Sequence, residues 1–334
     1  MQKVLARQGA GLVLVIIALA IVMASFAGSH QDRLTGQTVN NFLNAGTLIQ
    51  VATDTSFFAI MAVGMTVVII SGGIDLSVGS IYALSGVTSA LAMRATGSTS
   101  PLLAAAVCIG TGALAGLFNG TLISRLGVHP FIITLGTMWV CRGLAFVTTK
   151  AQSILVPEQL TQFTKSNLGL RQDLYPVPML VMLLMTLIGA TLLIKTVWGR
   201  RVFAIGGNVE ASRYAGVPIG RVIVGVYVFS GLTAGVAAFL GSSFYGSASS
   251  GDAQGYELFV IASAVVGGAS LTGGKGAAMG ALLGALLIVM IRQSIRTLGL
   301  DQNYEWIIIG VAIILAVVLD RLNTLLSEKR MRQA

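Results

Sequence analysis

Apolar stretches of about 20 residues follow one another along almost the whole chain, and they restrict the fold to one that lies in a lipid bilayer. The bilayer core holds no water, so each crossing segment must form a helix. The stretches cover residues 8–27, 47–70, 77–93, 101–124, 130–149, 176–197, 219–241, 257–271, 276–297 and 304–320, and the eighth is short enough to be a partial or tilted span. The sequence therefore predicts an all-α, polytopic transmembrane helix bundle of about ten spans, which forms a single domain over residues 1–334.

The charged residues agree with a membrane protein and orient it. Only 10% of the 334 residues are charged, against roughly 25% in soluble domains, and the mean hydropathy is +0.86. The net charge of +9 arises from Lys and Arg in short loops, so it indicates membrane orientation rather than binding to nucleic acid. With the N-terminus inside, the cytoplasmic segments hold nearly twice as many of these residues as the outer ones, which predicts that both termini are cytoplasmic. Lys3 and Arg7 before an apolar run also resemble a signal peptide, but the length of that run favours an uncleaved first span.

The sequence offers no cluster of metal ligands. Cys108 and Cys141 both lie inside apolar runs, where small buried side chains are expected rather than a disulfide or a metal pair. His30 and His129 are too isolated to form a metal site. We therefore expect no metal and no cofactor.

Two glycine-rich breaks interrupt the apolar pattern and resemble each other. One reads GGIDLS over residues 72–77 and the other reads GGASLT over residues 267–272, which suggests an internal repeat of the kind found in many transporters. Asp75 or Ser77 can cap the helix that follows the first break, close to the membrane surface. The alternative is a broken helix that lines a pathway, because irregular backbone at membrane depth is tolerated only inside protein or along water.

Arg142 is unusual because it lies in the middle of an apolar span. A buried arginine costs about 2.5–3.5 kcal/mol on insertion scales unless it is paired or reaches the membrane surface. Asp54 lies at a similar depth in the second span and is a candidate partner. Snorkelling of the side chain and a contact with another subunit are the alternatives.

The segment Trp198–Arg221 is the one sizeable basic loop between spans. It reads WGRRVFAIGGNVEASRYAGVPIGR, in which GGN suits a turn and residues 209–215 can form a short helix that ends at Gly216. The segment also carries apolar side chains that a solvated linker would not need, among them Phe203 and Tyr214. Its position predicts either a docking element on the cytoplasmic face or a simple basic anchor.

Several long motifs resemble a known family. They are VNNFLN at 39–44, AVGMTVVIISGGIDLSVGS at 62–80, FNG at 118–120, HPFIITLGTMWVCRGLAF at 129–146, AIGGNVEASRYAGV at 204–217 and GYELFVIASAVVGGASLTGGKG at 255–276. In this order they resemble the membrane subunit of a monosaccharide-importing ABC transporter, the ribose/xylose/galactose permease type. The chain departs from that family at Phe259, where the family usually has Asp, so any role of that carboxylate cannot be transferred.

The resemblance implies a set of partners and a location. Such permeases lie in the bacterial inner membrane, pair as two membrane subunits over two ABC ATP-binding subunits, and receive sugar from a periplasmic sugar-binding protein. The segment between the sixth and seventh spans resembles the element that docks on the ATPase. The residues that would form this coupling loop are Gly206, Gly207, Asn208, Glu210, Ala211, Arg213 and Gly216. The chain has no phosphate-binding GxxxxGK[ST] loop, so ATP hydrolysis belongs to a partner and the chain is not itself an enzyme.

The sequence also suggests polar groups along a transport pathway. The candidates are Asp75, Ser77, Asn119, Thr134, Thr137, Arg142 and Glu257, although Ser and Thr in spans more often bond their own helix. An ion-coupled secondary transporter of a small polar solute is the alternative function, and it would need charges within the membrane, of which this chain has few. A membrane-embedded enzyme ranks lower, because no catalytic constellation is present. The sequence does not say which sugar is carried, or whether the pore is a homodimer or a heterodimer.

Overall fold

The computed structural model describes residues 2–31, 36–170, 174–308, 310, 311, 314 and 318, with side chains from residue 10 onward. Within these residues the helices are α1 (Gln2–Phe26), α2 (Ala45–Ile70), α3 (Val78–Thr96), α4 (Pro101–Leu126), α5 (Pro130–Thr149), α6 (Glu158–Thr164), α7 (Pro176–Lys195), α8 (Val197–Gly207), α9 (Val209–Tyr214), α10 (Ile219–Tyr245), α11 (Tyr256–Val266) and α12 (Ala278–Thr297). Two short antiparallel pairs complete the fold, namely β1 (Ser29–Gln31) with β2 (Thr38–Asn40) and β3 (Ile154–Leu155) with β4 (Ser247–Ala248).

The helical fold agrees with the prediction of a polytopic membrane protein. In the described part of the chain, six helices are long and apolar enough to cross a bilayer: α2, α4, α5, α7, α10 and α12. α11 has only 11 residues and is about 16 Å long, so it is a partial span. The tenth predicted span, residues 304–320, and the basic tail beyond it lie largely outside the described residues. The chain is therefore a multi-pass membrane protein.

Local sequence signals explain where the long helices begin and end. Pro101, Pro130 and Pro176 each occupy the first turn of a helix, where a missing N–H costs nothing. Asn44 caps α2 by accepting a hydrogen bond from the Thr47 N–H, with 2.8 Å between the atoms. Gly97 ends α3 in the left-handed region. Because such residues mark the helix ends in the sequence, most predicted span boundaries lie within a few residues of the observed helix ends.

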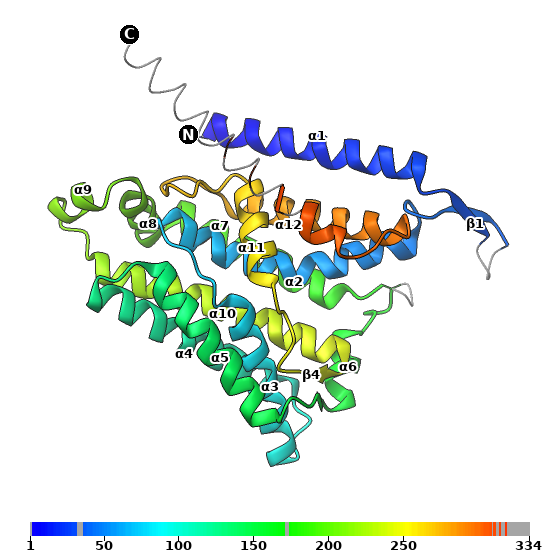
Figure 1. Cartoon of the computed structure of the whole chain (residues 1–334), viewed down its shortest axis with the longest axis horizontal. Coiled ribbons are helices and arrows are strands. Elements are labelled where there is room, and N and C mark those ends of the chain that lie inside the picture. The colour runs from blue at the N-terminus through cyan, green and yellow to red at the C-terminus, as the bar shows by residue number, and fades with distance from the viewer. Residues whose placement is uncertain are drawn as a thin grey trace, which may run out of the picture.

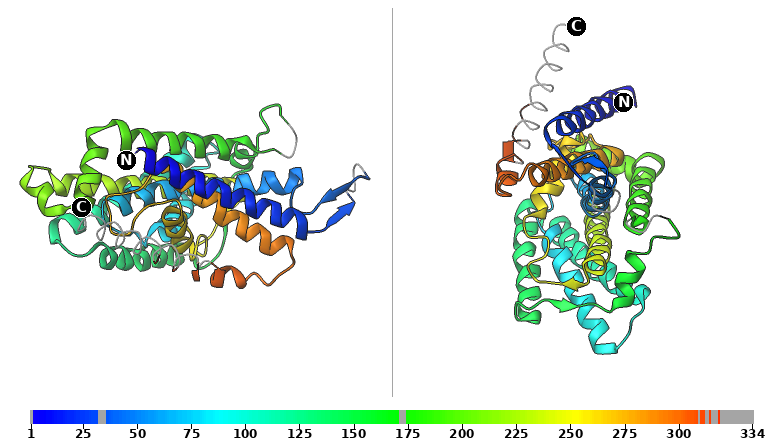
Figure 2. Two further views of the ribbon diagram at one scale, coloured as in Figure 1. Left: turned by 90° about the horizontal axis from the view of Figure 1, so that it is seen from above. Right: turned by 90° about the vertical axis from the view of Figure 1, so that its right-hand side faces the viewer.

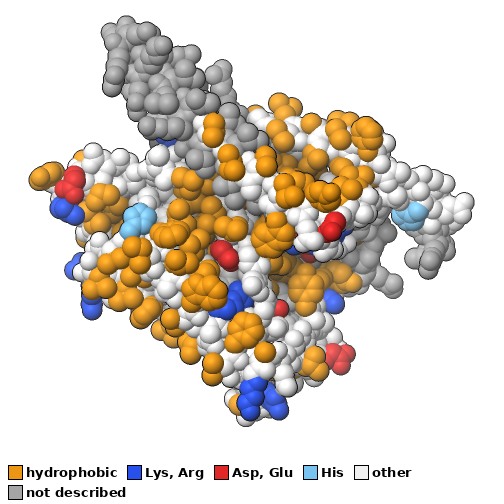
Figure 3. Space-filling model, viewed as in Figure 1, with side chains coloured by type: hydrophobic (Ala, Val, Ile, Leu, Met, Phe, Trp, Pro, Cys, Tyr) orange, Lys and Arg blue, Asp and Glu red, His pale blue; other side chains and the backbone are white. Residues whose placement is uncertain are grey.

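α2 forms the centre of the bundle. Every side chain from Thr55 to Ile70 is buried, and the helix contacts α7, α10, α11 and α12. Helices α4, α5 and α7 instead expose many large apolar side chains, which is the pattern of a surface that faces lipid. Figure 3 shows such side chains spread over one face of the molecule. α1 lies along one side of the bundle and contacts α12 (Figures 1 and 2).

Small residues bring α4 and α10 into direct backbone contact. A Cβ atom at Gly112 would overlap the carbonyl oxygen of Gly231, and one at Gly116 would overlap that of Tyr227. Close approach of this kind stabilises helix pairs in lipid, where no hydrophobic drive acts between them. Gly110, which precedes Gly112 by two positions on α4, has open space beside it.

The two glycine-rich breaks meet at one end of the molecule. After α2, residues 71–77 run back toward the middle of the bundle, where α3 begins (Figure 1). After α11, residues 267–277 form the loop that leads into α12. The Gly274 N–H donates a hydrogen bond of 2.9 Å to the carbonyl oxygen of Ile70, which joins the two breaks. Their descent from an internal repeat stays a prediction.

Candidate functional site

Asp75 lies in the first break and is completely buried. Its Oδ1 accepts hydrogen bonds from the backbone N–H and the hydroxyl of Ser77, and its Oδ2 accepts one of 2.8 Å from the Ser230 hydroxyl on α10. The carboxylate therefore tethers the start of α3 to α10 in the protein interior. It binds one backbone amide, as a cap does, and the side chain is fully enclosed by protein.

Two further predicted pathway residues, Asn119 and Thr134, form hydrogen bonds with Ser77 and with the backbone beside Asp75. The Asn119 amide on α4 donates to the Ser77 hydroxyl at 2.9 Å. The Thr134 hydroxyl on α5 lies 3.3 Å from the carbonyl oxygen of Ile74 and 3.0 Å from that of Pro130 in its own helix. Asp75, Ser77, Asn119 and Thr134 are all buried, so they hold the irregular break among three helices.

Arg142 does not pair with Asp54, and that prediction is wrong. Its Nη1 donates to the carbonyl oxygens of Ser250 and Asp252, at 2.6 and 2.7 Å. Asp54 instead pairs with Arg296 across 3.4 Å, and the Tyr245 hydroxyl lies 3.5 Å from its carboxylate. Backbone carbonyls can satisfy a guanidinium without a carboxylate, and this explains why depth alone selected the wrong partner.

Glu257 lies in the first turn of α11, directly against the first turn of α3. A Cβ atom at Gly79 would come within 2.6 Å of the Glu257 Oε2 and 2.5 Å of the Ala253 carbonyl oxygen, so only glycine fits there. The Oε2 atom is buried and has no hydrogen-bond partner in the described part of the chain. The N-termini of two helices that begin inside the bundle thus converge on one carboxylate.

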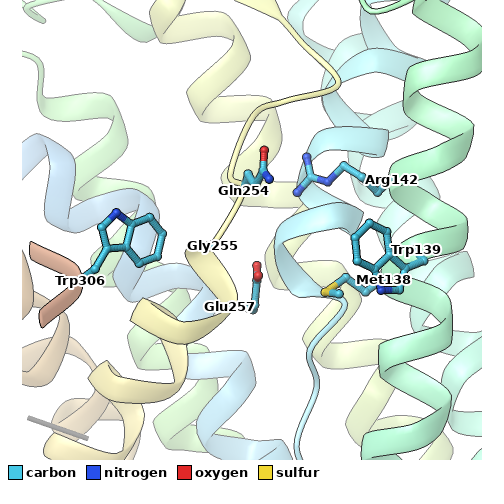
Figure 4. A pocket seen from close by; sticks show the side chains of 7 residues that line it. All are labelled: Met138, Trp139, Arg142, Gln254, Gly255, Glu257 and Trp306. Atoms are coloured by element: carbon cyan, nitrogen blue, oxygen red, sulfur yellow. The ribbon is translucent and has the colours of Figure 1, made fainter. Parts of the chain in front are cut away.

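A cavity of about 510 Å³ opens between α5 and the start of α11. It is lined by Met138, Trp139 and Arg142 from α5, by Gln254, Gly255 and Glu257, and by Trp306 (Figure 4). Arg142 and Glu257, two of the candidate pathway residues, line the same cavity, while Thr137 is buried on α5 and is not among the lining residues.

The sequence did not identify the aromatic members of this cavity. Trp306, which was not among the candidates, lines the cavity and packs closely on Gly255. Trp139 was overlooked, although it precedes Arg142 by three positions and so shares a helix face with it. That spacing was the available signal.

The basic segment folds into two short helices, α8 and α9. The predicted short helix is confirmed as α9, which begins after Asn208 and is followed by Gly216 with a φ of +74°. The Asn208 side chain caps α9 by accepting from the Ala211 N–H at 2.9 Å. Glu210 and Arg213 form an exposed ion pair of 3.0 Å on α9. α8 was not predicted, because the GGN sequence suggested a turn where the helix in fact continues to Gly207.

Not all residues of the predicted coupling loop have the same surroundings. Tyr214 is 89% exposed and extends from the end of α9. Gly207, Asn208, Glu210, Ala211, Arg213 and Gly216 are also exposed. Gly206, in contrast, packs against the ends of both glycine-rich breaks.

Comparisons with known proteins place the chain in a transporter family. Residues 47–317 match the family described as branched-chain amino acid transport system / permease component. The chain is 36% identical over 286 residues to the ribose import permease protein of Escherichia coli, covering 84% of this chain and 87% of the relative. It is 34% identical over 307 residues to the D-allose transport system permease protein of the same organism, covering 91% and 90%. It is 33% identical over 286 residues to the fructose import permease protein of Rhizobium meliloti, covering 84% and 79%.

No solved structure matches the chain. The family match covers most of the chain, and the three relatives extend over most of both lengths. This protein is therefore a transport permease rather than an enzyme, and it belongs to the permease-component family that matches residues 47–317, with the permease subunits of sugar ABC importers among its relatives.

Proposed function

We propose that this chain is the membrane subunit of a bacterial inner-membrane ABC importer, which moves a monosaccharide or a similar small polyol from periplasm to cytoplasm. The names of its relatives, which import ribose, allose and fructose, favour a sugar over a branched-chain amino acid. The chain carries the pathway, and a partner ATPase drives alternating access. Nucleotide can shift the equilibrium only if the ATPase contacts differ between the outward-open and inward-open states.

The cavity between α5 and α11 is the observation that carries this proposal. Two indole rings, those of Trp139 and Trp306, offer flat apolar surface to the C–H face of a sugar. Gln254, Glu257 and Arg142 offer hydrogen-bonding groups to its hydroxyls. Glu257 lines the cavity, which supports a role for its carboxylate as a hydrogen-bond acceptor for a passing hydroxyl. A carrier needs such a passage to bind weakly, since the periplasmic binding protein would supply most of the selectivity.

The remaining predicted pathway residues have a supporting role in this proposal. Asp75, Ser77, Asn119 and Thr134 fix the start of α3, whose first turn packs against Glu257. Thr137 packs inside α5. Substitutions among them should therefore disturb the shape of the passage rather than remove a contact with sugar.

The exposed face of α9 is the proposed contact with the ABC ATP-binding subunit. Glu210, Ala211, Arg213 and Tyr214 are exposed there, and the Asn208 cap and Gly216 fix the ends of the helix. A second permease subunit, identical or different, would complete the pore, and a periplasmic sugar-binding protein would deliver cargo to the opposite face.

We propose a topology of ten spans with both termini cytoplasmic. The six long helices would be joined by α1, by α3, by α11 together with its loop, and by the segment that starts at Tyr304. Placement of α8 and α9 on the cytoplasmic side is supported by the excess of Lys and Arg in the segments assigned there. Labelling of a cysteine placed at Tyr214 from the outside of intact cells would contradict this topology.

Uptake by proteoliposomes tests the function. The permease, reconstituted with its co-purified ATPase and binding protein, should take up labelled ribose, allose or fructose only when ATP is supplied. Trp139→Ala should lower this uptake, while Val140→Ala, which changes an exposed neighbour on the same helix that does not line the cavity, should not. Uptake driven by an ion gradient through the permease alone would favour the secondary-transporter alternative, for which Asp54, Asp75, Arg142 and Glu257 are the available charges.

A further inference from the structure

Gly206, in the last turn of α8, makes a backbone contact with two other segments at once. A Cβ atom at this position would overlap the carbonyl oxygen of Ile70 and would lie 2.6 Å from the backbone nitrogen of Gly274. The contact is equally close from the other side, because a Cβ at Gly273 would lie 2.6 Å from the Gly206 carbonyl oxygen. Only glycine allows three backbones to meet in this way.

The neighbouring Gly207 is less tightly enclosed. A Cβ atom at Gly207 would meet nothing within 4 Å, and Gly207 is exposed, although its Cα lies only 3.0 Å from the position that a Cβ of Gly274 would take. The two adjacent glycines, which the sequence presents as one turn, therefore have different surroundings. Gly110 on α4 has the same open space beside it and lies outside the segments that meet at Gly206, so it provides a control position.

The segments that meet at Gly206 lead to α3 and α11, the two helices that contact each other at Glu257 beside the cavity. Ile70 is the last residue of α2, and residues 71–77 run from it to the first turn of α3, beside Glu257. Gly274 lies in the loop that follows α11, the helix that carries Glu257. The hydrogen bond from the Gly274 N–H to the Ile70 carbonyl oxygen locks these two segments together directly under α8.

α8 is also firmly connected to α9. Only Asn208 separates the two helices, and its N–H bonds to the Ala204 carbonyl oxygen at 3.0 Å while its side chain caps α9. On the inner side of α8, Val202 and Ile205 are buried in the bundle. We therefore expect α8 to move together with α9. The backbone contact at Gly206 then joins α8 to the two glycine-rich segments.

We propose that Gly206 is a positioning residue of the coupling machinery, through which movement of α8 and α9 reaches both glycine-rich breaks and so the contact between α3 and α11 at Glu257, which lines the cavity. The inference rests on the proposed function, but it differs from the role that the resemblance gives to Gly206. The residue does not dock on the ATPase; it transmits the movement within the permease. A continuous series of backbone contacts supports this role. Backbone atoms in direct contact transmit a displacement, whereas flexible side chains between the segments would absorb part of it.

The structure gives the size of the disturbance expected from Gly206→Ala. The new Cβ would lie 2.6 Å from Gly274 N, whereas an ordinary van der Waals contact begins at 3.4 Å, so α8 must withdraw by about 0.8 Å or more. Its clash with the Ile70 carbonyl oxygen acts in the same direction, and backbone atoms cannot rotate out of the way. The exposed face of α9 remains unchanged by the substitution.

The experiment compares Gly206→Ala with Gly110→Ala in the complete transporter, reconstituted in liposomes. For Gly206→Ala we expect loss of ATP-driven uptake by about tenfold or more, with co-purification of the ATPase and its rate of ATP hydrolysis retained. Gly110→Ala, which makes the same change at a helix position where a Cβ meets nothing within 4 Å, should resemble the wild type in all three measurements. Wild-type uptake by Gly206→Ala would overturn the proposal, and loss of ATPase co-purification would show that Gly206 is a docking contact instead.

Amide hydrogen exchange on the wild-type complex gives a second test that needs no substitution, in case Gly206→Ala fails to fold. The Gly274 amide should stay protected both without nucleotide and in a nucleotide-trapped state, because a contact that transmits movement must persist in both. Rapid exchange of this amide in either state would overturn the proposal. Absence of ATP-driven uptake by the wild-type complex would instead contradict the proposed function and would leave the exchange result to decide the role of Gly206.

Discussion

The hydrogen bonds of Arg142 allow a prediction about how the cavity is held together. We consider Arg142→Gln, which removes both the charge and the reach of the side chain. In the wild type, Nη1 holds the carbonyl oxygens of Ser250 and Asp252, and these residues belong to the irregular segment that leads into α11. Ser250 is buried, so water cannot easily replace the lost donor. The substitution should therefore loosen the segment that carries Gln254 and Glu257.

The size of the effect follows from the nature of these bonds. A hydrogen bond from a charged donor contributes roughly 1.5–3 kcal/mol. The two bonds share one nitrogen atom and are not independent, so we expect a loss of about 2–4 kcal/mol in the free energy of unfolding. For a chain of 334 residues this corresponds to a fall in melting temperature on the order of 3–6 °C. Arg142→Lys retains the charge but not the planar fork, and its melting temperature should lie between those of the wild type and Arg142→Gln.

Thermal denaturation of the purified protein in detergent measures this effect. Arg94→Gln serves as the control, because Arg94 is an exposed residue in the last turn of α3 and its replacement removes the same charge. The control should melt with the wild type. If Arg142→Gln also melts with the wild type, the two carbonyl contacts contribute nothing to stability and the reasoning is refuted.

Three further predictions use other contacts of the described residues. Exchanging the charges of Asp54 and Arg296 together should restore the uptake lost in each single exchange, because they form the observed ion pair; failure of the double variant to recover uptake would count against that pair. Gly112→Val should lower the yield of folded permease in the membrane, since its side chain meets the backbone of α10, whereas Gly110→Val should be tolerated; equal yields would show that α4 and α10 do not need their close contact. Tyr214→Ala should weaken co-purification of the ATPase without changing the melting temperature, as expected of a side chain that is 89% exposed, and unchanged co-purification would exclude this ring as a docking contact.

Much of the fold could be predicted from the sequence, because every backbone polar group within lipid must be hydrogen-bonded inside the protein. Apolar length alone located the long helices, and proline and glycine marked their ends. α8 was missed because its amphipathic pattern, with Val202 and Ile205 facing inward, is short and ends in two glycines, which usually terminate helices. The family resemblance supplied what periodicity alone does not contain, namely the partners and the class of cargo.

The candidate site was harder to predict, because it depends on contacts between residues far apart in the chain. Asp54 and Arg142 were matched by their depth in the membrane, a single coordinate that says nothing about which helices are neighbours. Trp306 was not among the predicted pathway residues, because its place beside Gly255 depends on the fold. Arg142 and Glu257 were both proposed for the pathway because each is an expensive charge in an apolar setting, and both line the cavity.

Phe259 stands where the family usually has Asp, and the residues around it compensate for the missing carboxylate. The ring is buried on α11 and lies 4.9 Å from the guanidinium of Arg292, which also faces Phe58 and Tyr256. A carboxylate at this position would face the same guanidinium, so its loss leaves a cation to be satisfied. Glu305 forms a salt bridge with Arg292 from the segment after α12, and both side chains are largely buried. The charge is thus balanced from another part of the chain. The three rings add cation–π contacts, of which a carboxylate at residue 259 would replace only the one from Phe259.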